Sequence, residues 1–578
     1  MHRRTFIGLA GATAASGFLG AQPVSPAIAR SGTPSFVRAR LADRNRDRST
    51  VIARQGMICA SQPLATLIGI DVLKAGGNCV DAAIATNAAL GLMEPASCGI
   101  GGDLFAILWH ERDQKLYGLN ASGRAPGAWS LAQAQKRGLA SIPEQSPLSW
   151  SVPGCVDGWQ ALSRRFGVLG LARVLAPSIE YARTGFPISP LISRHFTSWT
   201  DAEYPHLAAL YHPGGKIPGY GEIFTNPLLA RSYEAIAKDG AAAFYDGEIA
   251  ERIVARSREL DGYMSLEDLR SHTSDWVDPV ASNYRGYDVW EIPPNGQGIA
   301  ALQILNLMEH FDVASLGHNS VDHLHLTVEA KKLAFEDRAQ YYADPAFADV
   351  PIDWLISKDY ARERVKRIDP KKAATDVAYG DPSLDSDTVY LCAADAEGNM
   401  ISLIQSLYSG FGSTICPEGV GFPMQNRGQG FSLDPQHRNR LEPGKRPFHT
   451  IIPAFMTKDA EPVMAFGVMG GDFQPQGHAQ VVMNMIDFGM SPQQATDVPR
   501  MRHDGSSSPW GDRMADGGEL LLEHGFDPAA IAGLTSRGHR IAERTYAHGG
   551  YQAIWRAEAP RRYFGGSDPR KDGQAIGF

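Results

Sequence analysis

The feature that most constrains this chain of 578 residues is a β-hairpin that begins abruptly at a threonine. Residues 376–387 are polar and contain Gly, Pro, Ser and Asp, as exposed linkers do. Thr388 then opens an apolar run to Ala394, and residues 395–399 form a turn before a second run over 400–407. The bond between Asp387 and Thr388 therefore joins a flexible segment to a rigid strand.

A threonine at this position suits catalysis under one condition. Its hydroxyl is a weak nucleophile and needs a base. At a chain N-terminus the free α-amine can act as that base, because its unperturbed pKa of about 7.7 to 8.0 lies near working pH. Thr388 gains this amine if its hydroxyl attacks the carbonyl of Asp387 and the resulting ester hydrolyses. Taken alone, the pattern far more often belongs to a threonine that merely opens a strand.

Length and composition limit the class of protein. A chain of 578 residues predicts two packed lobes or one large multi-layer domain. A hydrophobic content of 43% with 20% charged residues is that of a globular protein and excludes fibres and disorder. The net charge of −8 argues against a nucleic-acid partner, because there is no basic surplus to neutralise phosphates. No stretch is long and apolar enough to predict a membrane span.

Residues 1–29 have the pattern of an export signal. Arg3 and Arg4 precede a mildly apolar run, and Ala27-Ile28-Ala29 offers a small-x-small cleavage site. The twin arginines favour a Tat-type signal peptide over a Sec signal or a disordered tail, which predicts a periplasmic or secreted protein. Six cysteines follow without any CxxC spacing, and their apolar surroundings favour buried free thiols over disulfides.

Periodicity and punctuation predict several further elements. Apolar spacing indicates a helix over 64–74, and Asn78 is placed to cap a second, nearly all-apolar helix that ends before Pro95. A glycine loop over 97–103 leads into a buried strand over 104–109. The middle of the chain, about 125–375, reads as mostly helical, with a clear helix over 322–338.

Several segments together resemble the γ-glutamyltransferase family, also called γ-glutamyltranspeptidase or glutathione hydrolase. They occur in the family's order: Gly76-Gly77-Asn78-Cys79-Val80-Asp81-Ala82-Ala83, Glu94-Pro95-Ala96-Ser97-Cys98-Gly99-Ile100-Gly101-Gly102, Pro293-Pro294-Asn295-Gly296-Gln297-Gly298, Asp387-Thr388, Pro443-Gly444-Lys445-Arg446-Pro447, Gly470-Gly471, and Ser567-Asp568-Pro569-Arg570-Lys571-Asp572-Gly573. The resemblance implies an α+β fold, the four-layer αββα N-terminal-nucleophile hydrolase fold. It also implies autocleavage into a large subunit, 30–387, and a small subunit, 388–578, which stay together as a heterodimer.

The resemblance carries the catalytic residues over unevenly. It implies Thr388 as the nucleophile, Ser406 as the hydroxyl that orients it, and the N–H groups of Gly470 and Gly471 as the oxyanion hole. Family members have a second Thr and a His after the nucleophile, whereas Val389 and Tyr390 follow here.

The substrate pocket departs further from the family pattern. The family's amine-binding acid falls on Gly430, and its serine pair falls on His449 and Thr450. Its carboxylate-binding Arg aligns with Ser122; Arg124 lies two residues on, and Arg427 is a second candidate for that role. These departures resemble the branch that contains glutaryl-cephalosporin acylases, since glutaryl is γ-glutamyl without the amine. Amides of the same stretch remain alternative partners for an amine: Gln425, Asn426 and Gln429.

The resemblance thus implies an amidohydrolase or acyltransferase for a small γ-glutamyl (glutathione-type) or glutaryl amide. This chemistry needs a nucleophile, a base and oxyanion donors, so no cofactor is expected. No HExxH or Cys/His ligand spacing occurs, so no metal is expected, and His323 and His325 should face apart on their helix. A different class of function stays open: an uncleaved, catalytically silent exported binding protein. The departure from the family pattern at Val389 and Tyr390 supports this alternative.

Overall fold

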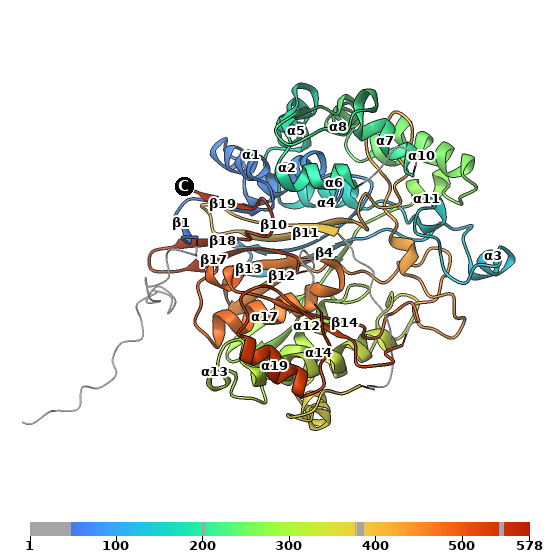
Figure 1. Cartoon of the computed structure of the whole chain (residues 1–578). Coiled ribbons are helices and arrows are strands. Elements are labelled where there is room, and N and C mark those ends of the chain that lie inside the picture. Colours follow the sequence, from blue (N-terminus) through green and yellow to red (C-terminus); the bar gives the residue numbers. More distant parts are fainter. Residues whose placement is uncertain (1–47, 199–202, 376, 378–386, 512, 543–547) are drawn as a thin grey trace, which may run out of the picture.

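Two seven-stranded sheets lie face to face between two layers of helices in the computed structural model (Figure 1). The structure describes residues 48–198, 203–375, 377, 387–511, 513–542 and 548–578. The predicted export signal and most of the predicted linker before Thr388 lie outside these residues. The predicted α+β fold with αββα layering is confirmed.

The first sheet carries the hairpin that opens at Thr388. Its strands lie in the order β19 (Gln574–Gly577), β2 (Met57–Ala60), β10 (Asp387–Ala394), β11 (Met400–Tyr408), β3 (Asp103–His110), β4 (Lys115–Ala121) and β7 (Asp275–Val277). All neighbouring pairs are antiparallel. The predicted hairpin over 388–407 is confirmed.

The second sheet is also antiparallel and stacks on the first. Its order is β1 (Val51–Ala53), β18 (Arg562–Ser567), β17 (Gly550–Ala557), β13 (Glu461–Met469), β12 (Ala454–Lys458), β9 (Tyr287–Glu291) and β8 (Val280–Tyr284). Smaller sheets are formed by β14 (Met501–Asp504), β15 (Glu519–Leu522) and β16 (Ile541–Ala542), and by β5 (Phe186–Pro187) and β6 (Ile223–Phe224).

Strand alternation divides the core into layers. Along β10, Tyr390 and Cys392 pack between the two sheets, whereas Val389, Leu391 and Ala393 pack under the helices. Side chains of a strand alternate between the two faces of its sheet, so both faces of β10 must be apolar to be buried. That requirement explains the unbroken apolar run that the sequence shows here.

The upper helical layer covers the first sheet (Figure 1). Its helices are α1 (Pro63–Lys74), α2 (Cys79–Met93), α4 (Cys155–Phe166), α5 (Leu171–Thr184), α6 (Pro190–Thr197), α7 (Pro205–Tyr211), α8 (Pro227–Asp239), α9 (Ala242–Tyr245), α10 (Glu248–Glu259) and α11 (Leu266–Arg270); α3 (Leu131–Lys136) projects to one side. Asn78 and Asp81 form a capping box at the start of α2, whose residues are all buried, as the sequence predicts.

The lower helical layer covers the second sheet. It comprises α12 (Gly298–Met308), α13 (Val313–Leu316), α14 (Val321–Tyr341), α15 (Ile352–Leu355), α16 (Lys358–Arg364), α17 (Gln474–Ile486), α18 (Gln494–Asp497) and α19 (Pro528–Ser536). The predicted helix over 322–338 is confirmed as the body of α14. Within the described residues, no helix is long and apolar enough to cross a membrane.

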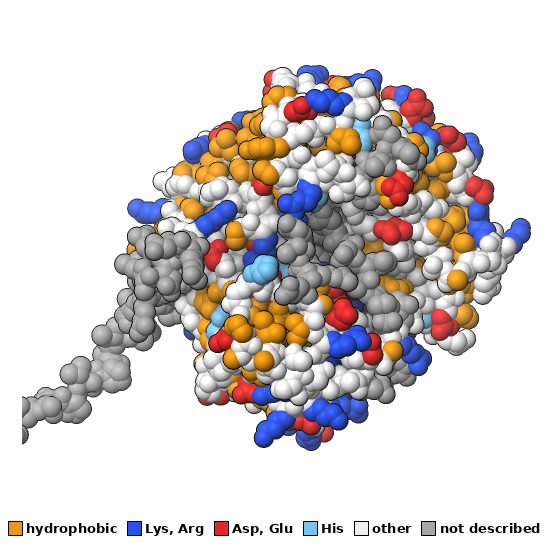
Figure 2. Space-filling model, viewed as in Figure 1, with side chains coloured by type: hydrophobic (Ala, Val, Ile, Leu, Met, Phe, Trp, Pro, Cys, Tyr) orange, Lys and Arg blue, Asp and Glu red, His pale blue; other side chains and the backbone are white. Residues whose placement is uncertain are grey.

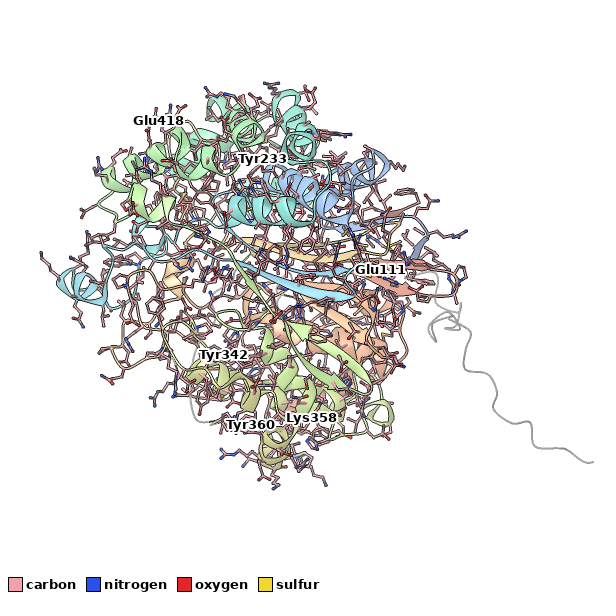
Figure 3. All side chains as sticks on the ribbon, turned by 180° about the vertical axis from the view of Figure 1, so that it is seen from behind. Glu111, Tyr233, Tyr342, Lys358, Tyr360 and Glu418 are labelled. Carbon is pink, nitrogen blue, oxygen red and sulfur yellow. The ribbon has the colours of Figure 1, made fainter. Side chains whose placement is uncertain are left out.

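Polar side chains link neighbouring elements within and between the layers, and three of them are labelled in Figure 3. In the upper layer, Tyr233 Oη donates to the carbonyl oxygen of Ala88 at 2.9 Å. In the lower layer, Tyr342 Oη donates to Gln303 Oε1 at 2.6 Å. Glu111, beyond the end of β3, pairs with Arg556 of the second sheet at 2.6 Å, so an ion pair links the two sheets.

Each sheet is built from both sides of the bond between residues 387 and 388. In the first sheet β10 lies between β2 from the earlier part and β11 from the later part, and in the second sheet β12 pairs with β9. The two predicted subunits therefore share one set of layers.

All six cysteines are buried and free, as predicted. On the face shown in Figure 2, basic and acidic side chains are interspersed.

Candidate active site

Thr388 is the second residue of β10 and is fully buried. Asp387 pairs with Tyr408 and Val389 pairs with Gln405, so β11 carries one residue more than β10 at this point. Such a bulge re-aims side chains, and it brings Ser406 opposite Thr388. Thr388 Oγ1 donates to Ser406 Oγ across 3.2 Å. The two hydroxyls that the sequence singles out are therefore in contact.

The chain beyond β11 makes a tight excursion and returns beside the strand. Tyr408 has a φ of +85°, in the left-handed region that only special contexts impose on a bulky residue. The return is fixed where Gln425 N donates to the carbonyl oxygen of Gly101 and Asn426 N donates to that of Leu407. A short 3-10 helix, Arg427–Gly430, follows directly. Arg427 is thereby brought to the end of the hairpin.

Ser406 links the nucleophile candidate to this arginine. Ser406 Oγ accepts a hydrogen bond from Tyr408 N at 2.8 Å and from Arg427 Nη2 at 3.4 Å. The guanidinium of Arg427 also lies over the Tyr408 ring, 4.1 Å from its centroid, and Nη1 donates to Thr450 Oγ1 at 2.8 Å. Thr388, Ser406, Arg427 and Thr450 thus form one continuous polar chain.

Arg427 is a buried cation with unused binding capacity. It is 1% exposed, and burial lowers the pKa of its guanidinium to about 10. Among the described residues no carboxylate lies within ion-pair distance of it, and its Nε has no hydrogen-bond partner. Burying a charge in this way is costly unless something pairs with it. The site therefore suits a ligand that brings a carboxylate.

Gly470 and Gly471 follow β13 and join the same network through a glutamine. Both glycines have positive φ, +119° and +56°, which an L side chain rarely adopts. Gln297 Nε2 donates to the carbonyl oxygen of Gly471 at 2.8 Å and to that of Thr450 at 2.7 Å. Since Thr450 is bonded to Arg427, one chain of hydrogen bonds connects the glycine loop with Thr388.

A fully satisfied buried carboxylate supports the site from behind. Asp103 pairs with Ser406 in the β3–β11 register. Its oxygens accept from Gln425 Nε2 at 2.9 Å and from His449 Nε2 at 3.0 Å. His449 Nδ1 accepts from Ile451 N at 3.3 Å, which leaves the imidazole proton on Nε2. His449 and the Nε2 of Gln425 are therefore held by Asp103, whereas the buried Oε1 of Gln425 has no hydrogen-bond partner among the described residues.

His449 gives the site a defined sensitivity to acid. Burial first, and then the charge of Arg427, lowers its pKa to about 4 from 6.5. Between pH 6.5 and 4 the unfolded chain binds this proton and the folded chain does not, so stability falls as pH falls through that window and no further below it. The full cost is on the order of 3 kcal/mol.

We expect His449→Gln, whose amide also donates to Asp103, to flatten this dependence. Melting temperatures of the wild type and the variant between pH 7.5 and 4.5 provide the measurement, with His524→Gln at an exposed position as the control. Parallel curves for all three proteins would contradict the assignment.

The other predicted site residues lie at different distances from this network. Arg124 donates to the carbonyl oxygen of Thr273 and pairs with Asp275 at 3.5 Å, a carboxylate that it shares with Arg446. Arg124 is therefore committed to an ion pair near the surface. Asn426 accepts from Ser409 N at 3.1 Å, and its Nδ2 donates to Glu144 Oε1 at 3.3 Å.

Three residues of this site were not predicted from the sequence. Gln297 lies in a segment that the family resemblance includes, but its contacts become visible only when Thr450 and Gly471 are brought together. Asp103 reads as the end of a glycine loop. Tyr408 reads as an ordinary strand residue, and nothing in its neighbours announces the positive φ.

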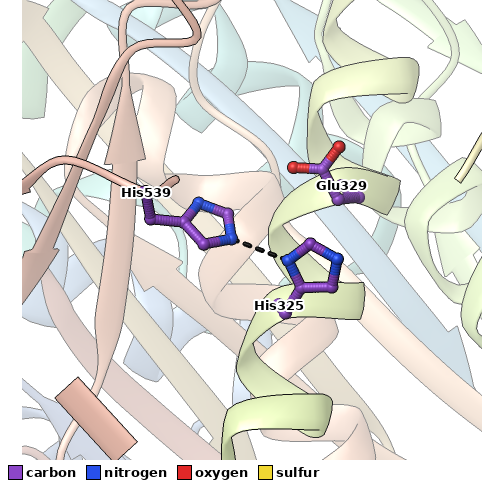
Figure 4. A group of neighbouring side chains, drawn as sticks. All are labelled: His325, Glu329 and His539. Carbon is purple, nitrogen blue, oxygen red and sulfur yellow. Dashed lines mark hydrogen bonds between the residues drawn. The ribbon is translucent and has the colours of Figure 1, made fainter. Parts of the chain in front are cut away.

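Three buried donors on the lower side are close enough together to suit a metal ion: His325 and Glu329 on α14 and His539 after α19 (Figure 4). All have protein partners. His325 Nδ1 lies 2.8 Å from His539 Nε2, its Nε2 bonds the carbonyl oxygen of Asp369, and Glu329 pairs with Lys332 at 2.8 Å. A buried ammonium beside the carboxylate opposes a second cation. We interpret the group as a polar joint between α14 and its neighbours.

Comparison with known proteins places these features in context. A model of the Gamma-glutamyltranspeptidase family matches residues 65–578. The chain is 37% identical over 538 residues to the Glutathione hydrolase-like YwrD proenzyme of Bacillus subtilis (strain 168), covering 92% of this chain and 99% of that protein. It is 32% identical over 530 residues to the Acylase ACY 1 proenzyme of Pseudomonas sp. (strain SE83), covering 89% and 92%. The crystal structure of cephalosporin acylase from Bacillus halodurans superposes with a TM-score of 0.84 at 42% identity, covering 92% and 97%.

Proposed function

The chain belongs to the gamma-glutamyltranspeptidase family, and we propose that it hydrolyses or transfers a carboxylate-bearing acyl group through an ester on Thr388. The family membership makes the chain an N-terminal-nucleophile amidohydrolase or acyltransferase. The observation that carries the proposal is the contact between Thr388 Oγ1 and Ser406 Oγ at the end of a network that reaches Arg427 and Gly471.

The proposed maturation is a cut between residues 387 and 388. Thr388 Oγ attacks the preceding carbonyl, and water hydrolyses the ester; together with removal of the export signal, this leaves a large subunit, 30–387, and a small subunit, 388–578. The small subunit then begins with the catalytic threonine. The word proenzyme in the names of the two curated relatives supports this step.

In the proposed reaction, Thr388 Oγ attacks the amide carbonyl while its own α-amine takes the proton and returns it to the leaving amine. The N–H groups of Gly470 and Gly471 stabilise the developing oxyanion. Water or an acceptor amine then releases the acyl group. The contacts of His449 also favour the α-amine as the base. Both ring nitrogens of this nearby imidazole already have partners, Asp103 and Ile451, so the imidazole is not available to take the proton.

The acyl group is proposed to carry a carboxylate that binds Arg427. The support is the buried guanidinium, which lacks an ion-pair partner among the described residues and lies next to Ser406. Glutaryl and γ-glutamyl groups both meet this requirement. Gly430 provides no acid at the family's amine-binding position, and this favours glutaryl over γ-glutamyl.

The alternative of a silent binding protein rests on Val389 and Tyr390, and the structure gives them an ordinary role. Val389 packs under the helices, and Tyr390 packs between the sheets with its hydroxyl 2.8 Å from Ser402 Oγ. Neither side chain belongs to the hydrogen-bonded network around Thr388. The named relatives are also enzymes, which favours a catalytic function over a silent binding protein.

A panel of p-nitroanilides tests the substrate proposal. We expect release of nitroaniline from the glutaryl compound at least about 10²-fold faster, as kcat/KM, than from the pentanoyl compound, which has the same chain length and no charge. Equal rates for the two would contradict a role for the carboxylate. A γ-glutamyl preference that Glu144→Gln removes would instead assign ammonium recognition to Glu144, which accepts a hydrogen bond from Asn426.

We further propose that residues 1–29 direct Tat export to the periplasm. The support is the twin arginine and the Ala27-Ile28-Ala29 site. Fractionation of cells that express Arg3→Lys/Arg4→Lys tests it: the variant should remain in the cytoplasm, whereas export of the variant at the wild-type level would contradict the proposal.

A further inference from the structure

Gln297 and Arg338 form a buried clamp beside the loop of Gly470 and Gly471. Gln297 Nε2 donates to two main-chain carbonyl oxygens, those of Thr450 and Gly471. Its Oε1 accepts from Arg338 Nη1 at 2.6 Å. Gln297 is fully buried and Arg338 is 1% exposed. Hydrogen bonds in such a water-poor environment are electrostatically stronger than at the surface, so this clamp holds the backbone firmly.

The same arginine pairs with a carboxylate next to the loop. Asp472 directly follows Gly471, and its Oδ1 lies 2.7 Å from Arg338 Nη1. Arg338 Nη2 donates in addition to the carbonyl oxygen of Ser507 at 3.1 Å. Without the arginine, a negative charge would lie close to the proposed oxyanion in a poorly solvated region, where charges act strongly.

The glycine loop needs such support because glycine does not define its own conformation. Two consecutive residues with positive φ are accessible to glycine at little cost, but other conformations are equally accessible. Phe473 N donates to the carbonyl oxygen of Gly470 at 3.0 Å, which orients the peptide between the two glycines. Gln297 orients the next peptide, which carries the Asp472 N–H, through the Gly471 carbonyl. Neighbouring groups thus fix the two peptides that flank Gly471, and with them the direction of its N–H.

We propose that Gln297 and Arg338 are positioning residues for the oxyanion site. Gln297 orients the peptide after Gly471, and Arg338 holds Gln297 while neutralising Asp472. The inference rests on the proposed function, because it takes the Gly470 and Gly471 N–H groups as the oxyanion donors. Neither positioning residue binds the acyl carboxylate, so their loss slows the chemical step and leaves substrate affinity nearly unchanged.

The first test is Gln297→Glu, which has the same shape, still accepts from Arg338 and loses both donated hydrogen bonds. Removing one oxyanion donor lowers kcat about 10²- to 10³-fold, so we expect kcat to fall by about 10² with KM within about threefold. Rates are expressed per free Thr388 N-terminus, counted by intact mass, so that slower maturation does not enter kcat.

The chain offers a matched control on α17. Gln480 is also a buried glutamine whose Nε2 donates to two main-chain carbonyl oxygens, those of Gln476 and Met501. Gln480→Glu repeats the same chemical change outside the site and is expected to retain the wild-type kcat. A loss of kcat shared by both variants would overturn the proposal, as would wild-type kcat in Gln297→Glu.

A second test separates the charge from the geometry. Arg338→Gln leaves Asp472 unpaired and is expected to lower kcat about 10²- to 10³-fold. Adding Asp472→Asn removes the uncompensated charge and should restore at least about tenfold of that loss. A double variant no faster than the single variant would overturn the assignment. A wild-type protein without a free Thr388 and without amidase activity would instead refute the proposed function itself.

Discussion

Thr388→Ala is expected to remain a single uncut chain with no measurable amidase activity, whereas the wild type separates into two chains. The small chain of the wild type should begin Thr-Val-Tyr-Leu. The loss should be at least about 10⁴-fold in kcat, because the variant lacks both the attacking oxygen and the free amine that cleavage creates. Intact mass, N-terminal sequencing and glutaryl-p-nitroanilide hydrolysis on the same preparations measure all three features.

Thr388→Ser separates the loss of the hydroxyl from a loss of fold. Serine keeps the attacking oxygen and the contact with Ser406, so this variant should still cleave, more slowly, and retain part of the activity. Complete cleavage in Thr388→Ala would show that another group makes the cut. If the wild type remained uncut after long incubation, the result would favour the alternative of a binding protein.

Arg427→Met is expected to give a more stable and much less active enzyme. Methionine removes a buried charge without an ion-pair partner among the described residues, so the melting temperature should hold or rise. The same change removes the proposed partner of the acyl carboxylate, so kcat/KM for glutaryl-p-nitroanilide should fall about 10²- to 10³-fold, mainly through KM. Hydrolysis of the uncharged pentanoyl compound should not fall in parallel.

Arg124→Met is the matched comparison, because the sequence leaves the two arginines as equal candidates. Arg124 is engaged by Asp275 and Thr273, so its loss should change KM for the glutaryl compound by less than about threefold. If Arg124→Met raised KM strongly and Arg427→Met did not, the carboxylate-binding role would pass from Arg427 to Arg124.

The sequence predicts most of the fold because its signals here are local. The box of Asn78 and Asp81 starts α2, and the turn after Ala394 closes the hairpin, and each depends on residues a few positions apart. The pairing of β10 with β2 was not predictable in this way, because it joins residues more than 300 positions apart and no local pattern encodes it.

The candidate site shows the same division. Thr388, Ser406 and the two glycines were predicted through resemblance, and hydrogen bonds connect them in the structure. The contrast between Arg124 and Arg427 was not predictable, because it depends on which arginine finds a carboxylate. That outcome is decided by Asp275, which lies about 150 positions from either arginine in the chain.

The sharing of both sheets between the two sides of residue 388 has a consequence for assembly. The proposed cut would make refolding a bimolecular process, because neither fragment contains a complete sheet against which the other can dock. On the proposed maturation, the uncut precursor carries the folding information, and we expect the cleaved enzyme to persist only through slow unfolding. After denaturant is removed, the uncut Thr388→Ala chain should therefore refold, and the active enzyme should not. The proposed activation is in this sense a one-way step: the cut that creates the catalyst would also remove its route back from the denatured state.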